Sequence, residues 1–137
     1  MKENSALFLK ALMERSIPYK LKNTRMGSSY SFDFALNDRI AQAEVCIFGD
    51  DNGLRLLIND FFIFDPELLD VVLDIINTAP ERAYATIYAL GDEVLIRKEI
   101  TTASGFSADR VLDTLDELSG IACSLVEKLE LVYSVLS

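Results

Sequence analysis

The chemistry available to this chain is limited first by the residues that it lacks. The sequence contains no histidine, which removes the commonest general base and the commonest transition-metal ligand. A Ser–His–Asp or Cys–His catalytic site therefore cannot form within one chain. The two cysteines, Cys46 and Cys123, lie far apart in no metal-ligand motif, and Cys46 has no activating neighbour. We expect both to be buried thiols in a reducing compartment.

Carboxylates are the remaining candidates for a metal or catalytic site. Asp109, Asp113 and Asp116 lie at helical spacing and share one helix face, with Glu117 next to them in the sequence. Such a row suits a hard metal ion, but no second carboxylate-bearing helix is evident to complete the ligand set. A solvated acidic helix face is therefore the favoured interpretation.

Neither of two glycine-containing features matches the pattern of a calcium-binding or phosphate-binding loop. Asp50-Asp51-Asn52-Gly53 resembles a calcium loop faintly, but it lacks the alternating ligands and the closing glutamate, so a hairpin turn is favoured. The glycines are scattered singly, which excludes a glycine-rich phosphate loop. From the sequence we predict no catalytic residue, no cofactor and no bound metal.

The composition indicates one acidic domain. The chain has 137 residues, of which 50% are hydrophobic, and we expect a single domain over residues 1–137. A net charge of −9 argues against a nucleic-acid partner, because phosphate binding needs a basic surface. Met1-Lys2-Glu3-Asn4 does not open a signal peptide, and no apolar run is long enough to span a membrane. We therefore expect a cytoplasmic protein without membrane contact.

The charge is unevenly distributed along the chain. Residues 1–25 carry six basic and two acidic groups, a net +4, and the remainder carries seven basic and twenty acidic groups, a net −13. The favoured interpretation is that the basic segment lies on the acidic body of its own domain. A basic docking edge for an acidic partner is the alternative.

A long amphipathic helix over residues 107–136 must position the three aspartates. Its apolar stripe repeats at alternating spacings of four and three, through Val111, Leu115, Leu118, Ala122, Leu125, Leu129, Val132 and Leu136. Ser107 is the expected N-cap. The helix would run about 45 Å, beyond the roughly 37 Å expected for the whole domain. Gly120 is the expected place for a bend or break. The half beyond it would either continue along the core or reach a second subunit.

The other elements follow from hydrophobic periodicity and turn residues. We expect a helix over 5–15, whose Leu7, Phe8 and Leu12 are core rather than a binding groove, and a polar connection over 19–25. Strands are expected at 29–37, 43–48, 54–58, 84–90 and 93–101, with turns at Asn52-Gly53 and Gly91-Asp92. A helix starts at Asp65-Pro66-Glu67 and ends by Pro80.

This order, α-β-β-β-α-β-β-α, predicts an α+β fold. The sheet should be five-stranded and antiparallel, with the helices packed on one face. The other face should be mostly wet, since it carries Ser31, Asp33, Glu44, Arg55 and Asn59.

Four consecutive large apolar residues, Phe61, Phe62, Ile63 and Phe64, cannot all face one core. They either cover two faces or meet a partner. Together with the end of the last helix, they form the predicted partner or dimer surface, which consists of Phe61, Phe62, Ile63, Phe64, Leu129, Val132, Tyr133 and Leu136.

The element order, the acidity and the amphipathic C-terminal helix resemble the type III secretion chaperone-like fold. Within it, Ile75-Ile76-Asn77 and the segment from Asp92 to Ile100, followed by Thr102-Ala103-Ser104-Gly105-Phe106-Ser107, look most like YbjN-like proteins. The resemblance covers nearly the whole chain in element order. It implies a homodimer without catalysis, and it supplies no functional residue.

The sequence thus predicts a non-catalytic protein-binding module, most similar to a YbjN-like regulatory or adaptor protein. One alternative is a dedicated type III secretion chaperone that binds an extended effector segment along apolar patches. The other is an enzyme or a small-ligand receptor with a pocket between helices and sheet, for which Tyr30, Tyr84 and Tyr88 would supply polar groups.

Overall fold

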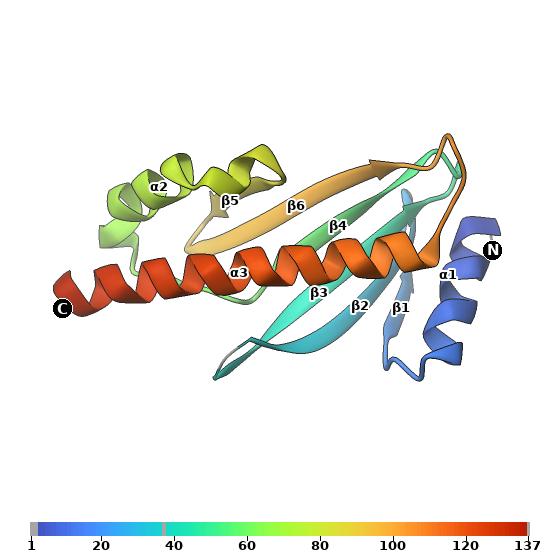
Figure 1. Cartoon of the computed structure of the whole chain (residues 1–137), viewed down its shortest axis with the longest axis horizontal. Helices are drawn as coiled ribbons and strands as arrows, with labels where there is room; N and C mark the ends of the chain where they lie inside the picture. Colours follow the sequence, from blue (N-terminus) through green and yellow to red (C-terminus); the bar gives the residue numbers. More distant parts are fainter. Residues whose placement is uncertain (1–2, 37, 137) are drawn as a thin grey trace.

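The computed structural model describes residues 3–36 and 38–136 and confirms the α+β class (Figure 1). The helices are α1 (Glu3–Glu14), α2 (Leu69–Thr78) and α3 (Ala108–Leu136), and short 3₁₀ turns at Pro66–Leu68 and Pro80–Ala83 flank α2. The strands are β1 (Lys20–Asn23), β2 (Gly27–Leu36), β3 (Arg39–Phe48), β4 (Gly53–Asn59), β5 (Thr86–Leu90) and β6 (Glu93–Thr101). Asn37, the predicted end of the first strand, lies outside the described residues.

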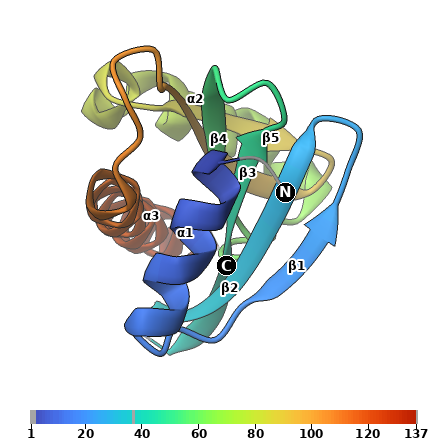
Figure 2. The same ribbon diagram turned by 90° about the vertical axis from the view of Figure 1, so that its right-hand side faces the viewer.

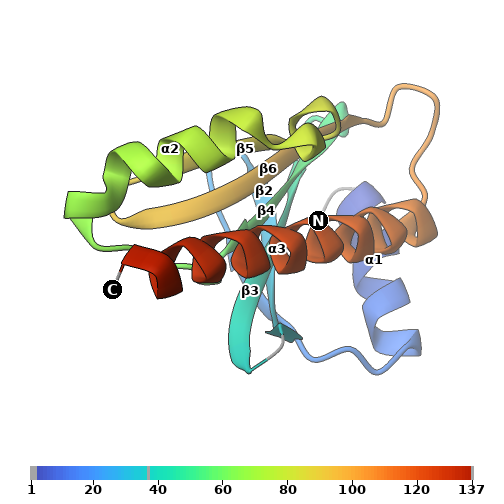
Figure 3. The same cartoon turned by 60° about the vertical axis from the view of Figure 1, so that its left-hand side comes forward.

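The strands form one antiparallel sheet in the order β1-β2-β3-β4-β6-β5. Neighbouring strands that follow one another in the chain form hairpins. The exception is β4, which pairs with β6, so that β5 lies at the outer edge of the sheet. Figure 2 shows α1 and α3 on one side of this sheet, and Figure 3 shows α2 beside α3. The fold is therefore a two-layer arrangement of helices on a sheet.

The sheet has six strands, so the prediction of five was wrong. The missed strand is β1, which pairs with β2 through Leu21 opposite Tyr30. It is four residues long, exposed along its whole length, and carries one apolar residue between Lys20 and Lys22. Backbone pairing, rather than burial of side chains, holds such a strand, and hydrophobic periodicity does not detect it. Its lysines are typical of a protected sheet edge.

The two predicted turns form, but one uses a different residue. Gly91-Asp92 joins β5 to β6, and Gly91 has φ +64°, as a tight hairpin requires. In the β3–β4 turn the positive φ falls on Asp51 rather than on Asn52 or Gly53. Gly53 already lies in β4, where a Cβ would stand 2.8 Å from the carbonyl oxygen of Ile100. Its role is to permit close strand approach rather than left-handed backbone.

The long helix α3 runs without a break through Gly120. Gly120 is exposed, and no atom lies within 4 Å of where its Cβ would be. The predicted N-cap is confirmed, because the Ser107 hydroxyl accepts from the amide of Arg110 at 3.2 Å. With 29 residues the helix runs about 44 Å, beyond the roughly 37 Å expected for a compact domain of this length.

The apolar stripe of α3 joins one core on both sides of Gly120. Val111, Leu115 and Leu118 before it, and Ala122, Leu125, Val126 and Leu129 after it, are all buried in the same cluster. Beyond Leu129 only one side of the helix keeps contact with that cluster, through Tyr133. Leu131, Val135 and Leu136 are 67%, 75% and 54% exposed.

A buried polar network attaches the start of α1 to the sheet. The hydroxyls of Ser5 and Tyr30 lie 2.6 Å apart, and the Tyr30 hydroxyl donates to the Ser5 carbonyl at 3.1 Å. Burial raises the pKa of Tyr30, although its bond with Ser5 opposes the change. Asn4 donates to the carbonyl of Asp51 and to Thr102. These bonds fix α1 over β2, at the level where it can line a groove with α3.

Candidate binding groove

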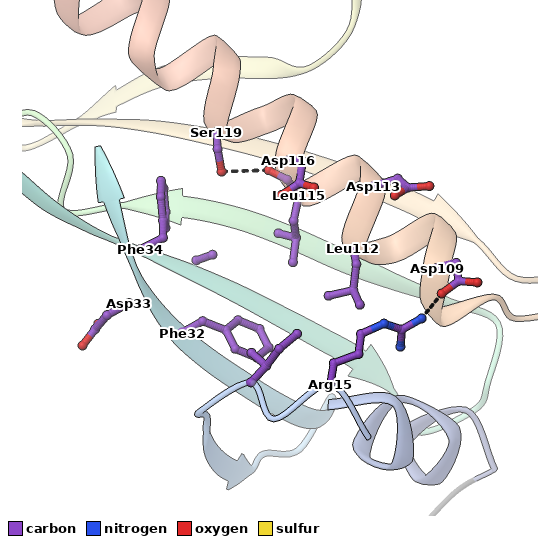
Figure 4. Close-up of a pocket in the computed structure, with 12 residues that line it drawn as sticks. Arg15, Phe32, Asp33, Phe34, Asp109, Leu112, Asp113, Leu115, Asp116 and Ser119 are labelled. Carbon is purple, nitrogen blue, oxygen red and sulfur yellow. Dashed lines mark hydrogen bonds and ion pairs between the residues drawn. The ribbon is translucent and has the colours of Figure 1, made fainter. Parts of the chain in front are cut away.

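A groove lies between the C-terminal end of α1, the strands β2 and β3, and the first half of α3. Its volume is about 580 Å³, within the range of ligand-binding sites. Figure 4 shows the residues that line it. Its floor is apolar and consists of Ile17, Phe32, Phe34, Ala43, Leu112 and Leu115. Its rim is polar and consists of Arg15, Asp33, Asp109, Asp113, Asp116 and Ser119.

Helical periodicity explains the α3 wall. Residues three and four apart share a face, so Asp109, Leu112, Asp116 and Ser119 follow one another along the groove. The same periodicity places Leu115 against the sheet, where it is buried. The aspartates that the sequence singled out therefore line the groove rim. Their carboxyl groups are on exposed residues, as predicted for a solvated acidic face.

Strand alternation explains the sheet wall. Phe32 and Phe34 point from β2 toward the helices, and Ala43 pairs opposite Phe32 on β3. Figure 4 shows the carboxylate of Asp33 on the far side of β2, directed away from α3. The acidic groups that face the groove are therefore those of α3.

One cation closes the end of the groove. The Arg15 guanidinium pairs with the Asp109 carboxylate and also donates to the carbonyl of Ala11 at 3.4 Å. Figure 4 shows the Arg15 side chain extending past Leu112 toward Asp109. This pair links the end of α1 to the first turn of α3. It is one contact of the kind predicted between the basic N-terminal segment and the acidic body.

A second hollow, of about 630 Å³, lies on the other side of α3, beside β6 and Tyr84. Lys98 donates to the carbonyl of Tyr84 at 2.6 Å, and its ammonium stands 3.7 Å from the centre of the Tyr84 ring. Burial raises the pKa of the Tyr84 phenol, and the Glu117 carboxylate adds to the increase. Both side chains are thus held in structural contacts.

The three tyrosines proposed as polar groups of one pocket do not converge. Tyr30 is fully buried and bonded to Ser5, and Tyr84 lines the second hollow. Tyr88 pairs opposite Leu95, with the Arg97 guanidinium 5.5 Å from its ring centre. Because strand alternation puts it on the face opposite buried Ile87, it points away from both hollows.

The predicted partner surface divides in two. Phe61, Phe62, Phe64 and Leu129 are buried in the chain's own core, so placing them on a surface was wrong. The chain leaves the strand at Asp60, which has φ +57°, and from there all three phenylalanines turn inward. Ile63 and Leu136 are 66% and 54% exposed, whereas Val132 and Tyr133 are half-buried. The Tyr133 ring packs edge-on against Phe62 at 5.7 Å.

Sequence reasoning offered a pocket between helices and sheet only as an alternative, and none of the three tyrosines assigned to it lines this groove. The walls of the groove come from four elements that the pattern could not place in space. The aspartate spacing on α3 was the one available signal. Sequence reasoning also missed the exposed residues Leu131 and Val135, because both lie opposite the apolar stripe and look like isolated surface residues.

The cysteines, a metal site and a membrane span are the remaining features considered from the sequence. Cys46 is a buried thiol whose pKa is raised by burial, which disfavours the reactive thiolate, and Cys123 is half-buried. Among residues 3–36 and 38–136, no three His, Cys, Asp or Glu side chains are grouped to hold a metal ion. No helix in the described part of the chain combines the length and apolarity of a membrane span.

Comparisons of the chain with protein-family models, curated proteins and solved structures found no match. The resemblance to YbjN-like proteins and to the type III secretion chaperone-like fold therefore stays a prediction that rests on the order of elements and on short segments of the sequence.

Proposed function

We propose that this chain is a non-catalytic protein-binding module that holds an extended segment of another protein in the groove between α1, the sheet and α3. The observation that carries this proposal is the apolar floor of that groove, where Phe34 and Leu112 are only half-buried in the folded chain. Apolar side chains left partly exposed in a concave surface favour binding of a complementary apolar group.

The polar groups of the groove support binding rather than catalysis. They are carboxylates on an exposed helix face together with one paired guanidinium. We therefore propose an adaptor or regulatory role of the YbjN-like kind. The dedicated type III secretion chaperone is the same proposal with a narrower partner class.

A second copy of the chain is the partner that we propose for the end of α3. Leu131, Val135 and Leu136 are among its most exposed apolar residues, and Leu136 belongs to the surface predicted from the sequence. This dimer is independent of the groove, whose α3 residues run from Asp109 to Ser119 in the first half of the helix.

The groove is tested by selection from a displayed library of short random peptides, followed by titration of the selected peptides. Leu112→Gln replaces a half-buried floor residue with a polar one, and Leu7→Gln changes an exposed leucine of α1 outside the groove. We expect Leu112→Gln to lower affinity about tenfold and Leu7→Gln to leave it unchanged. Failure to select any peptide, or equal binding by both variants, would contradict the proposal.

A further inference from the structure

We infer that the segment held in the groove is cationic, with a lysine or arginine adjacent to an apolar anchor residue. This inference rests on the proposed function and names the class of partner. The groove combines an apolar floor with a negatively charged rim, which is complementary to a cationic segment. Asp109, Asp113 and Asp116 edge the groove along α3, and Arg15 is the one cation in its described lining.

The negative charge on this rim is only partly neutralised within the chain. Asp109 pairs with Arg15, whereas none of the ion pairs formed by the described residues involves Asp113 or Asp116. Both aspartates stand on exposed residues, one turn apart. A cation placed over the floor near Leu115 would therefore be closest to the Asp116 carboxylate. Asp113, which also borders the second hollow on the other side of α3, would add negative charge one turn away.

Arg15 shows how such a side chain fits. Its alkyl stem passes Leu112, and its guanidinium reaches the carboxylate of Asp109 (Figure 4). Arginine and lysine both combine an apolar stem with a charged head, which suits a surface that is apolar below and acidic at the rim. Arg15 thus occupies one end of the groove as a cation from the same chain, and a partner's cation either takes the other end or displaces it.

The experiment begins with the selected peptides and their titration. We expect lysine and arginine to be enriched beside an aromatic or aliphatic residue, and affinity to fall as salt is raised, because exposed charges are screened. The double variant Asp113→Asn/Asp116→Asn should lower affinity about three- to tenfold. Its matched control is Asp70→Asn/Asp74→Asn, which removes the same charge from an exposed face of α2 outside the groove and should change nothing.

Arg15 provides the opposite prediction. Arg15→Gln frees Asp109 for the partner, so cationic peptides should bind about threefold more tightly. Weaker binding by Arg15→Gln would show that the arginine is part of the wall rather than a competitor, and would overturn the inference.

The two proposals fail in different ways. Peptides that bind through Leu112 but show neither enrichment of basic residues nor sensitivity to Asp113→Asn/Asp116→Asn would overturn the cationic partner and leave the binding module standing. Selection of no peptide at all would overturn both. Amide chemical-shift mapping of a selected peptide adds a location, and shifts confined to α2 would contradict the groove as the site.

Discussion

Arg39, the first residue of β3, donates a hydrogen bond of 2.9 Å to the main-chain carbonyl of Phe61. Its guanidinium also pairs with Glu130 of α3 and lies 5.8 Å from the ring centre of Phe62. One side chain therefore connects the start of a strand, the segment after β4 and the last third of the long helix. These contacts hold the Phe61–Phe62 backbone beside the end of α3.

Replacing this arginine should loosen the segment after β4. We expect Arg39→Gln to lower the free energy of unfolding by about 1–2 kcal/mol, chiefly because the Phe61 carbonyl loses a charged donor. Urea unfolding measures the change. Lys10→Gln, which removes an exposed pair with Glu14 within α1, is the control and should shift stability by less than about 0.5 kcal/mol. Equal effects would mean that the Arg39 contacts add nothing beyond a surface ion pair.

The buried Tyr30 predicts a specific response to alkaline pH. Its folded-state pKa is raised above its ordinary value of 10.0, chiefly by burial, so the folded protein resists losing that proton. The stabilisation is complete below pH 10 and is lost as pH rises toward and through the folded-state pKa. Urea midpoints should therefore fall above about pH 10.

Tyr30→Phe isolates this contribution. The variant should be less stable at neutral pH by about 1 kcal/mol, because Ser5 loses its partner, and its alkaline decline should be shallower. Tyr84→Phe is the comparison, since that phenol also has a raised pKa but belongs to a half-buried residue beside Glu117. An unchanged alkaline slope in Tyr30→Phe would contradict the assignment to this phenol.

Gly53 and Gly49 border the same turn and should respond differently to alanine. A Cβ at Gly53 would stand 2.8 Å from the Ile100 carbonyl oxygen, which is backbone and cannot rotate away, whereas the nearest atom to a Cβ at Gly49 is 3.7 Å distant. We expect Gly53→Ala to cost about 1–3 kcal/mol in unfolding free energy through strain between β4 and β6. Gly49→Ala should be nearly neutral, and the same loss at both sites would argue against a packing cause.

The proposed dimer is tested at the end of α3. Light scattering at micromolar concentration should give twice the mass of one chain, and Leu131→Gln/Val135→Gln should give a single chain. Both side chains are largely exposed, so the stability of the isolated monomer should change little. A wild-type protein that is monomeric at this concentration would remove the dimer, while the groove proposal would be unaffected.

Sequence periodicity predicted the parts of this fold that bury regular apolar patterns. The helix capped by Ser107, the core strands and the Gly91-Asp92 turn all follow from local spacing, and they are confirmed. The pattern failed where backbone conformation decides. The backbone changes direction at Asp60, which has a positive φ, and Phe61, Phe62 and Phe64 after it are buried. A run of four consecutive apolar residues does not predict such a change in backbone direction.

The candidate site was predictable only as an acidic row on one helix. Its apolar floor brings Phe34 of β2 and Leu112 of α3 into one groove, although most of the chain separates them in the sequence. Likewise, Arg15 belongs to a generally basic segment in the sequence, and only the packed structure identifies Asp109 as its partner. Long-range contacts of this kind have no signature in a single sequence.

The order of the elements, with α3 following the meander that it covers, has a consequence for synthesis on the ribosome. The β2–β3–β4 meander and its apolar face emerge before residues 111–129, which later cover that face. Until then, side chains such as Val45 and Leu56 have only α1 and α2 available as cover within the chain. Nascent chains halted before α3 should therefore expose the apolar face of the sheet and recruit general chaperones. That face is buried only after α3 has left the exit tunnel.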